Sequence, residues 1–489
     1  MKRFASLAAA LLAGCSLAPT FEMPVVDVPA QYKELAPSER GNWKTAEPAE
    51  GAPRGEWWHV FGDPMLDGLE QQAIAANQTL AGAAARVKQA RAIVGVVEAD
   101  RIPQIGAAFG PYRYQPSTAS QNLPPNTQLS PFTVWRGVLT ASYEVDLFGR
   151  IGDRIAATRS DAAASEATYQ SVLLALQADV AQTYFAIRQT DEELRVVREQ
   201  VELRAESVRI VQRRFDLGDI SELDLAQAKT NLALAQNDAI ALERARGQLE
   251  HGLAVLLGKP PADFALAVAP FPIVPPAIPA GLPSTLLERR PDVATAVQIM
   301  AAANSRIGVA RAAFFPVLNL TALGGYESAE LGDLFKWSSR TWLLGPLFGA
   351  ILTMPIIDGG RNRSNLDRAY AALEESVAGY RQTVLVAFAD VEDNLIALRT
   401  LAGQAQVTGD SVGSAKRAFD IANTRYNRGA SSFLEVIEAQ RSLLVVQQLN
   451  ARIQGARAIS TVALIRSLGG GWDAPVAAAQ AMPASEAKP

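Results

Sequence analysis

Apolar residues recur at alternating intervals of three and four positions in two long stretches without proline, residues 132–259 and 356–474. This spacing is typical of helices that pack side by side as a coiled coil. The stretch from Asp153 to Leu217 also lacks glycine, and as a helix it would be roughly 100 Å long. The pattern is fullest in the segment that follows, at Leu225, Ala228, Leu232, Ala235, Ala239, Leu242, Leu249, Leu253 and Leu256. We therefore predict a long antiparallel helical hairpin in each stretch.

A period of two precedes each helical hairpin and predicts strands. In one strand, Trp135 and Leu139 share a face, whereas Arg136 and Thr140 lie on the other. The predicted strands are residues 102–115 and 132–146 in the first half, and 317–326 and 341–357 in the second. Two interpretations remain open at this point. The pairs form half-buried soluble hairpins, or they form membrane hairpins with the apolar face towards lipid and the polar face towards a lumen.

The chain is an internal duplication, because residues 214–223 return as residues 425–434 with Arg, an aromatic residue, Gly, Ser and Leu in register. The same offset relates further pairs: Gly149 and Gly360, Tyr169 and Tyr380, Asp179 and Asp390, Arg188 and Arg399, and Gln236 and Gln447. Gly218 and Gly429 stand where a helix needs a left-handed residue after its end. Ser221 and Ser432 stand where the next helix needs an N-cap. Each copy is therefore a tight turn between two helices, in one structural unit that occurs twice.

The N-terminus has the pattern of a secretory signal, with Lys2 and Arg3 followed by a short apolar run. Leu12-Ala13-Gly14-Cys15 resembles the box of bacterial lipoproteins, in which the cysteine becomes the mature N-terminus and carries lipid. The alternative is a plain signal with an incidental cysteine. Cys15 is the only cysteine in the chain, and we therefore favour its lipidation.

Proline distribution divides the rest of the chain. Residues 16–62 and 260–283 are proline-rich and predict an extended strap and a linker. Asp63 is expected to cap a helix that begins at Pro64. The expected segments are a signal peptide (1–14), a lipid-anchored extended segment (15–62), a first repeat (63–259), a proline-rich linker (260–283), a second repeat (284–471) and a disordered tail (472–489).

Charge and composition exclude several function classes. The formal net charge is −4 without a basic block, so nucleic acid is not an expected partner. Two histidines and one cysteine provide no zinc cluster, and we expect no metal or other cofactor. His59 and His251 do not lie beside a nucleophile motif, and no phosphate-binding loop is present. We therefore expect a passive protein rather than an enzyme.

Four strands per chain cannot close a barrel, and an open strand edge cannot face lipid because its N–H and C=O groups would stay unpaired. If the strands enter a membrane, several chains must contribute them to one barrel. Two chains would give eight strands and three would give twelve. The long helix pairs would likewise combine into a hollow cylinder.

The sequence resembles the TolC-type outer-membrane factors, in particular the NodT-type efflux lipoproteins, over nearly the whole mature chain. The residues that carry the resemblance are Leu12–Cys15, Trp57-Trp58 with Phe61–Pro64, Tyr143–Arg150, Leu287–Asp292, Ala313–Pro316, Pro355–Arg361 and the two glycine turns. The resemblance implies a mixed, mainly α fold. It also implies a homotrimer in which a 12-stranded outer-membrane β-barrel continues into a long periplasmic α-helical barrel.

The same resemblance implies the function and the partners. Such a trimer is the exit duct of a tripartite efflux system and conducts small molecules such as drugs. A periplasmic adaptor (membrane fusion) protein links it to an inner-membrane pump, typically of the resistance-nodulation-division type, and outer-membrane lipid surrounds it. In this family the turns meet the adaptor, which assigns that contact to Arg214, Gly218, Ser221, Leu223, Arg425, Gly429, Ser432 and Leu434.

The family closes its tunnel with rings of side chains, often Asp, at the periplasmic end. Asp420, about two turns before Gly429, is the gate candidate, and Asp410 is the second. A ring of carboxylates repels its own members and attracts cations. The alternative for each residue is an ordinary solvated helix charge.

Two other functions remain open. The duct could serve type I protein secretion, or the chain could be a soluble periplasmic coiled-coil scaffold without membrane strands. Trp135, Tyr143, Tyr326 and Trp342 near the strand ends favour a membrane aromatic girdle over the scaffold.

Overall fold

A computed structural model describes residues 16–26, 32–34, 55–269, 271, 290–345 and 349–470. The predictions for the signal segment, Cys15, most of the linker and the tail lie outside these residues. The contacts divide the chain into two units. The first contains residues 86–166 and 295–381 with the start of the strap, and the second contains residues 26–85, 167–294 and 382–489.

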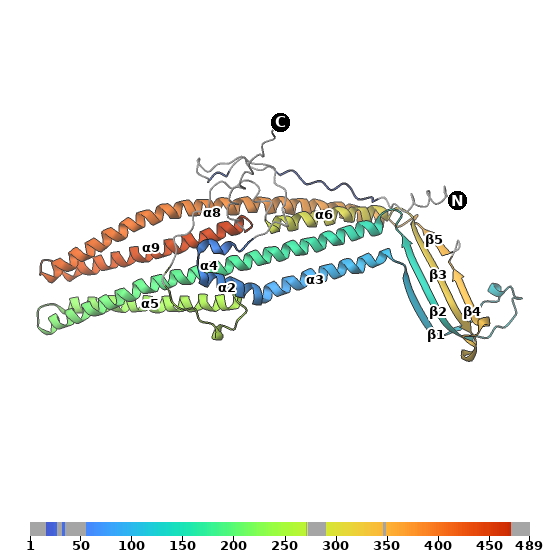
Figure 1. Cartoon of the computed structure of the whole chain (residues 1–489), viewed down its shortest axis with the longest axis horizontal. Helices are drawn as coiled ribbons and strands as arrows, with labels where there is room; N and C mark the ends of the chain where they lie inside the picture. The colour runs from blue at the N-terminus through green and yellow to red at the C-terminus, as the bar shows by residue number, and fades with distance from the viewer. Residues whose placement is uncertain are drawn as a thin grey trace, which may run out of the picture. The chain divides into compact units, whose positions relative to one another are not determined.

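The first unit contains an antiparallel sheet in the order β1-β2-β3-β4, with β5 also paired to β3 (Figure 1). The strands are β1 (Gln104–Tyr114), β2 (Phe132–Val145), β3 (Val317–Ser328), β4 (Arg340–Leu344) and β5 (Ala350–Thr353). The register pairs Leu139 of β2 with Ala107 and Gly324, and it pairs Arg136 with Gly110 and Glu327. The alternation predicted for the strands is therefore confirmed, and the two repeats contribute to one continuous sheet.

The prediction of one continuous strand over residues 341–357 is wrong. It is divided into β4 and β5, which pair one after the other with β3. Leu344 pairs with Ala322 and Ala350 pairs with Leu320, so the outer strand carries extra residues at this point. Gly349 has a φ of +101°, and the sequence between the strands includes a proline, which cannot donate a hydrogen bond to a strand ladder.

The predicted long helices are confirmed. The helices are α2 (Pro64–Ala76), α3 (Gln78–Glu98), α4 (Arg150–Asp216), α5 (Glu222–Leu256), α6 (Pro291–Ala312), α8 (Arg361–Asn427) and α9 (Phe433–Ser467). Both α4 and α8 have 67 residues. Among the described residues, no helix is sufficiently long and apolar to cross a bilayer.

Side chains that are close in sequence cap the first turns of α2 and α3. Asp63 accepts hydrogen bonds from the backbone N–H groups of Met65 and Leu66 ahead of α2, as predicted. A single residue, Asn77, separates α2 from α3. This residue ends α2, and its side chain accepts a hydrogen bond from Leu80 N and donates one to Leu256 O.

The main core of the second unit surrounds the start of α2 and the middle of α4. Trp57 and Trp58 are 4% and 1% exposed and pack in this core with Phe61, Tyr184 and Phe185. The tryptophan pair is therefore packed within the protein.

The described parts of the strap are fixed by hydrogen bonds. In the first unit, Ser16 Oγ donates to Asp153 Oδ1 (2.6 Å), and Asn304 Nδ2 donates to Pro19 O (2.7 Å). In the second unit, the N–H groups of Lys33 and Glu34 donate to the carboxylate of Glu392 at 2.7 and 3.1 Å. The strap is therefore an ordered part of each unit where it is described.

Candidate functional site

The first turn, between α4 and α5, ends one helix and begins the next with local hydrogen bonds. Gly218 has a φ of +79°. Asp219 N donates to Arg214 O and Gly218 N donates to Phe215 O, both at 2.9 Å. These two bonds form a Schellman motif. Ser221 then caps α5, because its hydroxyl accepts from Asp224 N and its own N–H donates to the Asp224 carboxylate.

The second turn repeats the backbone but not the side-chain cap. Gly429 has a φ of +71°, and Ala430 N donates to Arg425 O at 2.9 Å. Ser432 is the N-cap residue of α9, as predicted, but its side chain forms no cap hydrogen bond with the described residues. Glu435, which stands where Asp224 stands in the first repeat, instead pairs with Arg425 at 3.5 Å. The acidic residue is therefore not available to complete a capping box.

The two turns lie together in the second unit and share an apolar cluster. Val211, Leu225 and Ala228 of the first hairpin pack with Tyr426, Phe433, Val436 and Ile437 of the second. Tyr426 is 8% exposed and contacts Phe433 with ring centres 5.2 Å apart. The structure thus brings together turn residues that lie about two hundred positions apart in the sequence.

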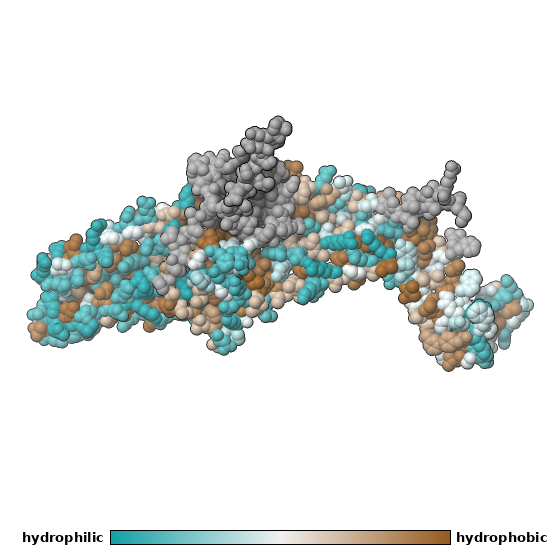
Figure 2. All heavy atoms as spheres, viewed as in Figure 1, coloured by the Kyte–Doolittle hydropathy of each residue, from teal (hydrophilic) through white to brown (hydrophobic). Residues whose placement is uncertain are grey.

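Beyond this cluster the tips expose single apolar side chains on a mainly hydrophilic surface (Figure 2). Leu223 is 65% exposed and Leu434 is 52% exposed. Both stand two residues after the serine that precedes their helix. Leu217 is a further exposed residue, at 72%, that the sequence analysis did not select. Its position one residue before Gly218 was the available signal.

Asp410 and Asp420 are both exposed on α8. Their carboxylates form no hydrogen bond or ion pair with the described part of the chain. The equivalent positions in the first repeat differ, because Glu199 and Arg209 stand there and pair with Arg195 and Glu206 of their own helix. The second repeat therefore presents two uncompensated carboxylates near its turn.

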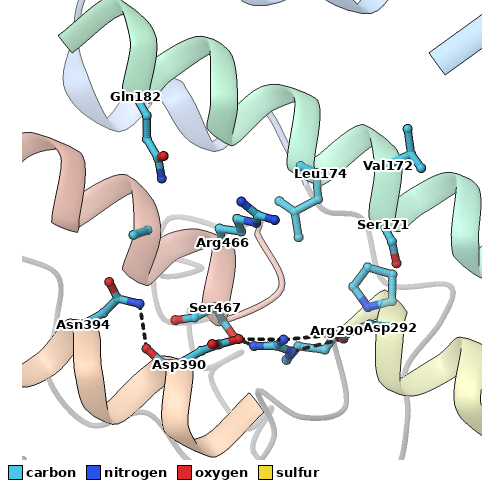
Figure 3. A pocket seen from close by; sticks show the side chains of 13 residues that line it. Ser171, Val172, Leu174, Gln182, Arg290, Asp292, Asp390, Asn394, Arg466 and Ser467 are labelled. Atoms are coloured by element: carbon cyan, nitrogen blue, oxygen red, sulfur yellow. Dashed lines mark hydrogen bonds and ion pairs between the residues drawn. The ribbon is translucent and has the colours of Figure 1, made fainter. Parts of the chain in front are cut away.

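A second ionic site lies in the second unit, in a cavity of about 570 Å³ lined by α4, α8, α9 and the start of α6 (Figure 3). Arg290 is 8% exposed there, and it donates to Asp292 (2.7 Å), Asp390 (3.1 Å) and Ser467 O (3.0 Å). Burial alone would lower the pKa of Arg290, but the two carboxylates outweigh it and raise the pKa. The guanidinium thus stays charged and joins three helices.

The duplication is visible at Arg466, which lines this cavity. Asp179, the counterpart of Asp390, lies 3.6 Å from Arg466. Burial raises the pKa of Asp179, and Arg466 opposes the shift. The sequence match between Asp179 and Asp390 indicated no role for either residue.

Arg188 and Arg399, another matched pair, each hold an extended segment. Arg188 is 2% exposed and donates to Asp191 (3.0 Å) and to Ala267 O (2.7 Å). Arg246 completes the network at Asp191 (2.7 Å). Arg399 donates to the Glu34 side chain in the strap. Sequence reasoning missed these contacts, although the repeat offset marks both arginines.

A duplicated chain with an apolar-and-polar sheet and two long helical hairpins defines a class of channel-forming outer-membrane proteins. The model of the family described as "Outer membrane efflux protein" matches residues 69–259 and 282–470. The chain belongs to this family, which consists of channels rather than enzymes, and its place is the bacterial outer membrane.

Named relatives cover nearly the whole chain. It is 34% identical to the pyoverdine export outer membrane protein OpmQ of Pseudomonas aeruginosa, over 96% of this chain and 97% of that protein. It is 32% identical to the cation efflux system protein CusC of Escherichia coli, over 94% and 96%. The crystal structure of the Campylobacter jejuni CmeC outer membrane channel has a TM-score of 0.85 and 28% identity, over 94% and 96%. The predicted family and fold class are confirmed.

Proposed function

We propose that three copies of this chain form the passive exit duct of a tripartite efflux pump. The sheet with two open edges carries the proposal. Among the described residues, β1 pairs only with β2, and β4 and β5 pair only with β3. Unpaired edges are unstable in lipid, so the edges of neighbouring copies must pair and close a barrel. The polar face of the sheet then lines water.

The cargo is a small molecule that the pump selects. OpmQ is named for pyoverdine export and CusC for cation efflux, so one architecture carries chemically different cargo. The duct itself performs no reaction and needs no cofactor. Because the chain belongs to a family of channels, we reject the alternative of a soluble periplasmic scaffold that the sequence had left open.

The test is single-channel conductance of the detergent-extracted protein in planar bilayers, with mass determination of the same sample. A trimer that conducts supports the duct. A monomer or dimer without conductance overturns it.

We propose that the two turns bind the periplasmic adaptor through Arg214, Gly218, Ser221, Leu223, Arg425, Gly429, Ser432 and Leu434. The exposed Leu223 and Leu434 provide apolar contacts that solvent would otherwise surround. Leu223→Ser together with Leu434→Ser should abolish drug resistance in cells that depend on this duct. Leu234→Ser is the matched control, because Leu234 is 56% exposed on α5 away from the turn. Equal loss with the control variant would contradict the assignment.

We propose that Asp420, with Asp410 further up α8, closes the periplasmic end. Three copies of an uncompensated carboxylate around one axis repel one another and bind cations. Asp420→Ala should raise the conductance, whereas Glu438→Ala, an exposed residue on α9, should leave it unchanged. Unchanged conductance in the Asp420 variant would remove Asp420 from the gate and leave the duct intact.

We also propose that Cys15 carries lipid and anchors the N-terminus in the same membrane. Mass spectrometry of the N-terminal peptide tests this directly. A mature N-terminus at another residue would contradict it.

A further inference from the structure

The polar face of the sheet carries its charges in pairs. The five strands contain five charged residues: Arg113, Arg136, Glu144, Glu327 and Arg340. By register, Arg136, Glu144 and Glu327 share the polar face with Thr140 and Ser142. Arg136 pairs with Glu327, and Glu144 pairs with Arg150 at the start of α4. Each strand charge on this face is therefore compensated.

Arg113 and Arg340 lie on the opposite, apolar face. In the strand register, Arg113 of β1 stands opposite Thr133 and directly follows Tyr112 in the sequence. Arg340 of β4 stands opposite Tyr326. Arg340 also lies over the ring of Trp337. Both arginines are at the loop end of the sheet, where a cation at the membrane surface meets lipid headgroups. They are thus separate from the compensated set.

Near the loop end, Arg136 and Glu327 form a closed triangle of hydrogen bonds with Tyr112, across three strands. Arg136 Nε and Nη2 donate to Glu327 Oε2 at 2.9 and 2.7 Å. The Tyr112 hydroxyl donates to Glu327 Oε1 at 2.9 Å and accepts from Arg136 Nη2 at 3.1 Å. Both oxygens of the carboxylate are engaged, and the Arg136 and Glu327 side chains remain 38% and 28% exposed. Water and solutes on this face therefore reach a pair of opposite charges.

The loop that joins β1 to β2, residues 115–131, contains no charged residue. In the loop after β3, Asp333 pairs with Lys336 and Glu330 is exposed. The Arg136–Glu327 pair is thus the main charged feature of the polar face at the loop end of the sheet, which is the outlet of the proposed duct. In a pore with low-dielectric walls, an unpaired charge at this position would be focused and would act on each passing solute.

We propose that Arg136 and Glu327, bridged by Tyr112, cancel each other at the outlet and set its electrostatic potential, so that the outlet accepts cargo of either charge. This proposal rests on the proposed function, because the polar face must line the lumen. Three copies form a ring whose net charge is zero. Removing one partner converts the ring into three like charges and creates a charge filter. Selection of cargo by charge then belongs to other parts of the pump.

The test measures the potential at this ring without requiring an open gate. Cys15 is the only cysteine of the chain, so with Cys15 acylated as proposed, Thr341→Cys in the detergent-extracted trimer introduces a single free thiol. Thr341 pairs with Gly325 on the same face, diagonally from Glu327 and roughly 8 Å away. Cationic and anionic methanethiosulfonate reagents are added to this trimer at low salt, where screening is weak, and they reach the thiol through the outlet. The ratio of their rates reports the local potential.

Glu327→Gln should shift this ratio about fivefold or more towards the anionic reagent, and Arg136→Gln should shift it equally towards the cationic one. The double variant should return to the ratio of the parent. Arg113→Gln is the matched control and should change nothing. An unchanged ratio in both single variants, with the trimer intact by mass, overturns the proposal.

A purely structural role for the triangle predicts loss of assembly without this opposite pattern, and that result also overturns the proposal. If Thr341→Cys reacts with neither reagent, the face is not in water, and the lumen assignment fails with it. The conductance of the parent protein tests the duct separately. A conducting trimer with an unchanged ratio would refute the inference alone.

Discussion

The guanidinium carbon of Arg214 lies 5.2 Å from the centre of the Tyr426 ring. The backbone carbonyl of each residue also accepts a hydrogen bond within its own turn, since Arg214 O accepts from Asp219 N and Tyr426 O accepts from Gly429 N. The contact therefore joins the Schellman turn of one repeat to that of the other. A cation over an aromatic ring contributes about 0.5–1 kcal/mol at a partly exposed site.

This relationship separates two roles of Tyr426. Its hydroxyl is buried and has no hydrogen-bond partner in the described structure, which costs about 1–3 kcal/mol. Tyr426→Phe keeps the ring and should preserve or raise the thermal midpoint. Tyr426→Leu loses the ring and should lower it. A lower midpoint for Tyr426→Phe would show that the hydroxyl gains a partner in the assembled trimer.

Glycine substitutions should have opposite effects at the turn and within α8. Gly429 has a φ of +71°, so Gly429→Ala should cost about 1–2 kcal/mol of stability. Gly413 is helical, and an added Cβ there meets nothing within 4 Å. Gly413→Ala should therefore stabilise by about 0.5–1 kcal/mol. Thermal unfolding of the two variants in the same detergent measures the difference, and equal shifts would contradict the assigned turn.

The sequence was sufficient where one local rule decides the structure. The heptad spacing predicted the long hairpins, the alternation predicted which face of β2 carries Arg136, and Asp63 was recognised as a cap. These features depend on neighbours within a few positions. The division into β4 and β5 was missed because two glycines and a proline interrupt a pattern that stays apolar on both sides.

The contacts between distant segments could not be predicted in the same way. Arg290 pairs with Asp390 across one hundred positions, and Arg188 binds the carbonyl of Ala267. Charged residues are common on exposed helices, so periodicity does not show which ones become buried. The missing capping box at Ser432 could not be predicted for the same reason, because Glu435 forms an ion pair with Arg425 instead.

The matched arginines should differ in their contribution to stability. Arg188 and Asp191 have side chains 3% and 1% exposed, and removal of one partner of a buried pair costs about 3–5 kcal/mol. Arg399 is 55% exposed where it pairs with Glu34, and such a pair contributes about 0–1 kcal/mol. Arg188→Ala should therefore lower the thermal midpoint markedly, and Arg399→Ala should hardly change it. Similar effects of the two substitutions would contradict the burial difference.

Glu70 should make stability depend on pH. Its side chain is fully buried in α2, and neither carboxylate oxygen has a hydrogen-bond partner among the described residues. Burial, with a smaller contribution from Asp67, raises the pKa of Glu70 from 4.5 to about 9. Between these values the folded chain retains a proton that the unfolded chain releases. The contribution of Glu70 is therefore most favourable below about pH 4.5, and it is lost as the pH rises towards 9, by about 1.4 kcal/mol per pH unit at most.

Glu70→Gln keeps the shape of the protonated side chain and removes the titration. The thermal midpoints of the variant and the parent should coincide near pH 5 and separate progressively towards pH 8, with the variant more stable. Glu374→Gln, at an exposed position of α8, is the control and should follow the parent at every pH. If the Glu70 variant also runs parallel to the parent, the carboxyl of Glu70 is already neutralised by a partner or by water in the assembled protein. The buried, unpartnered acid would then not be a property of the native trimer.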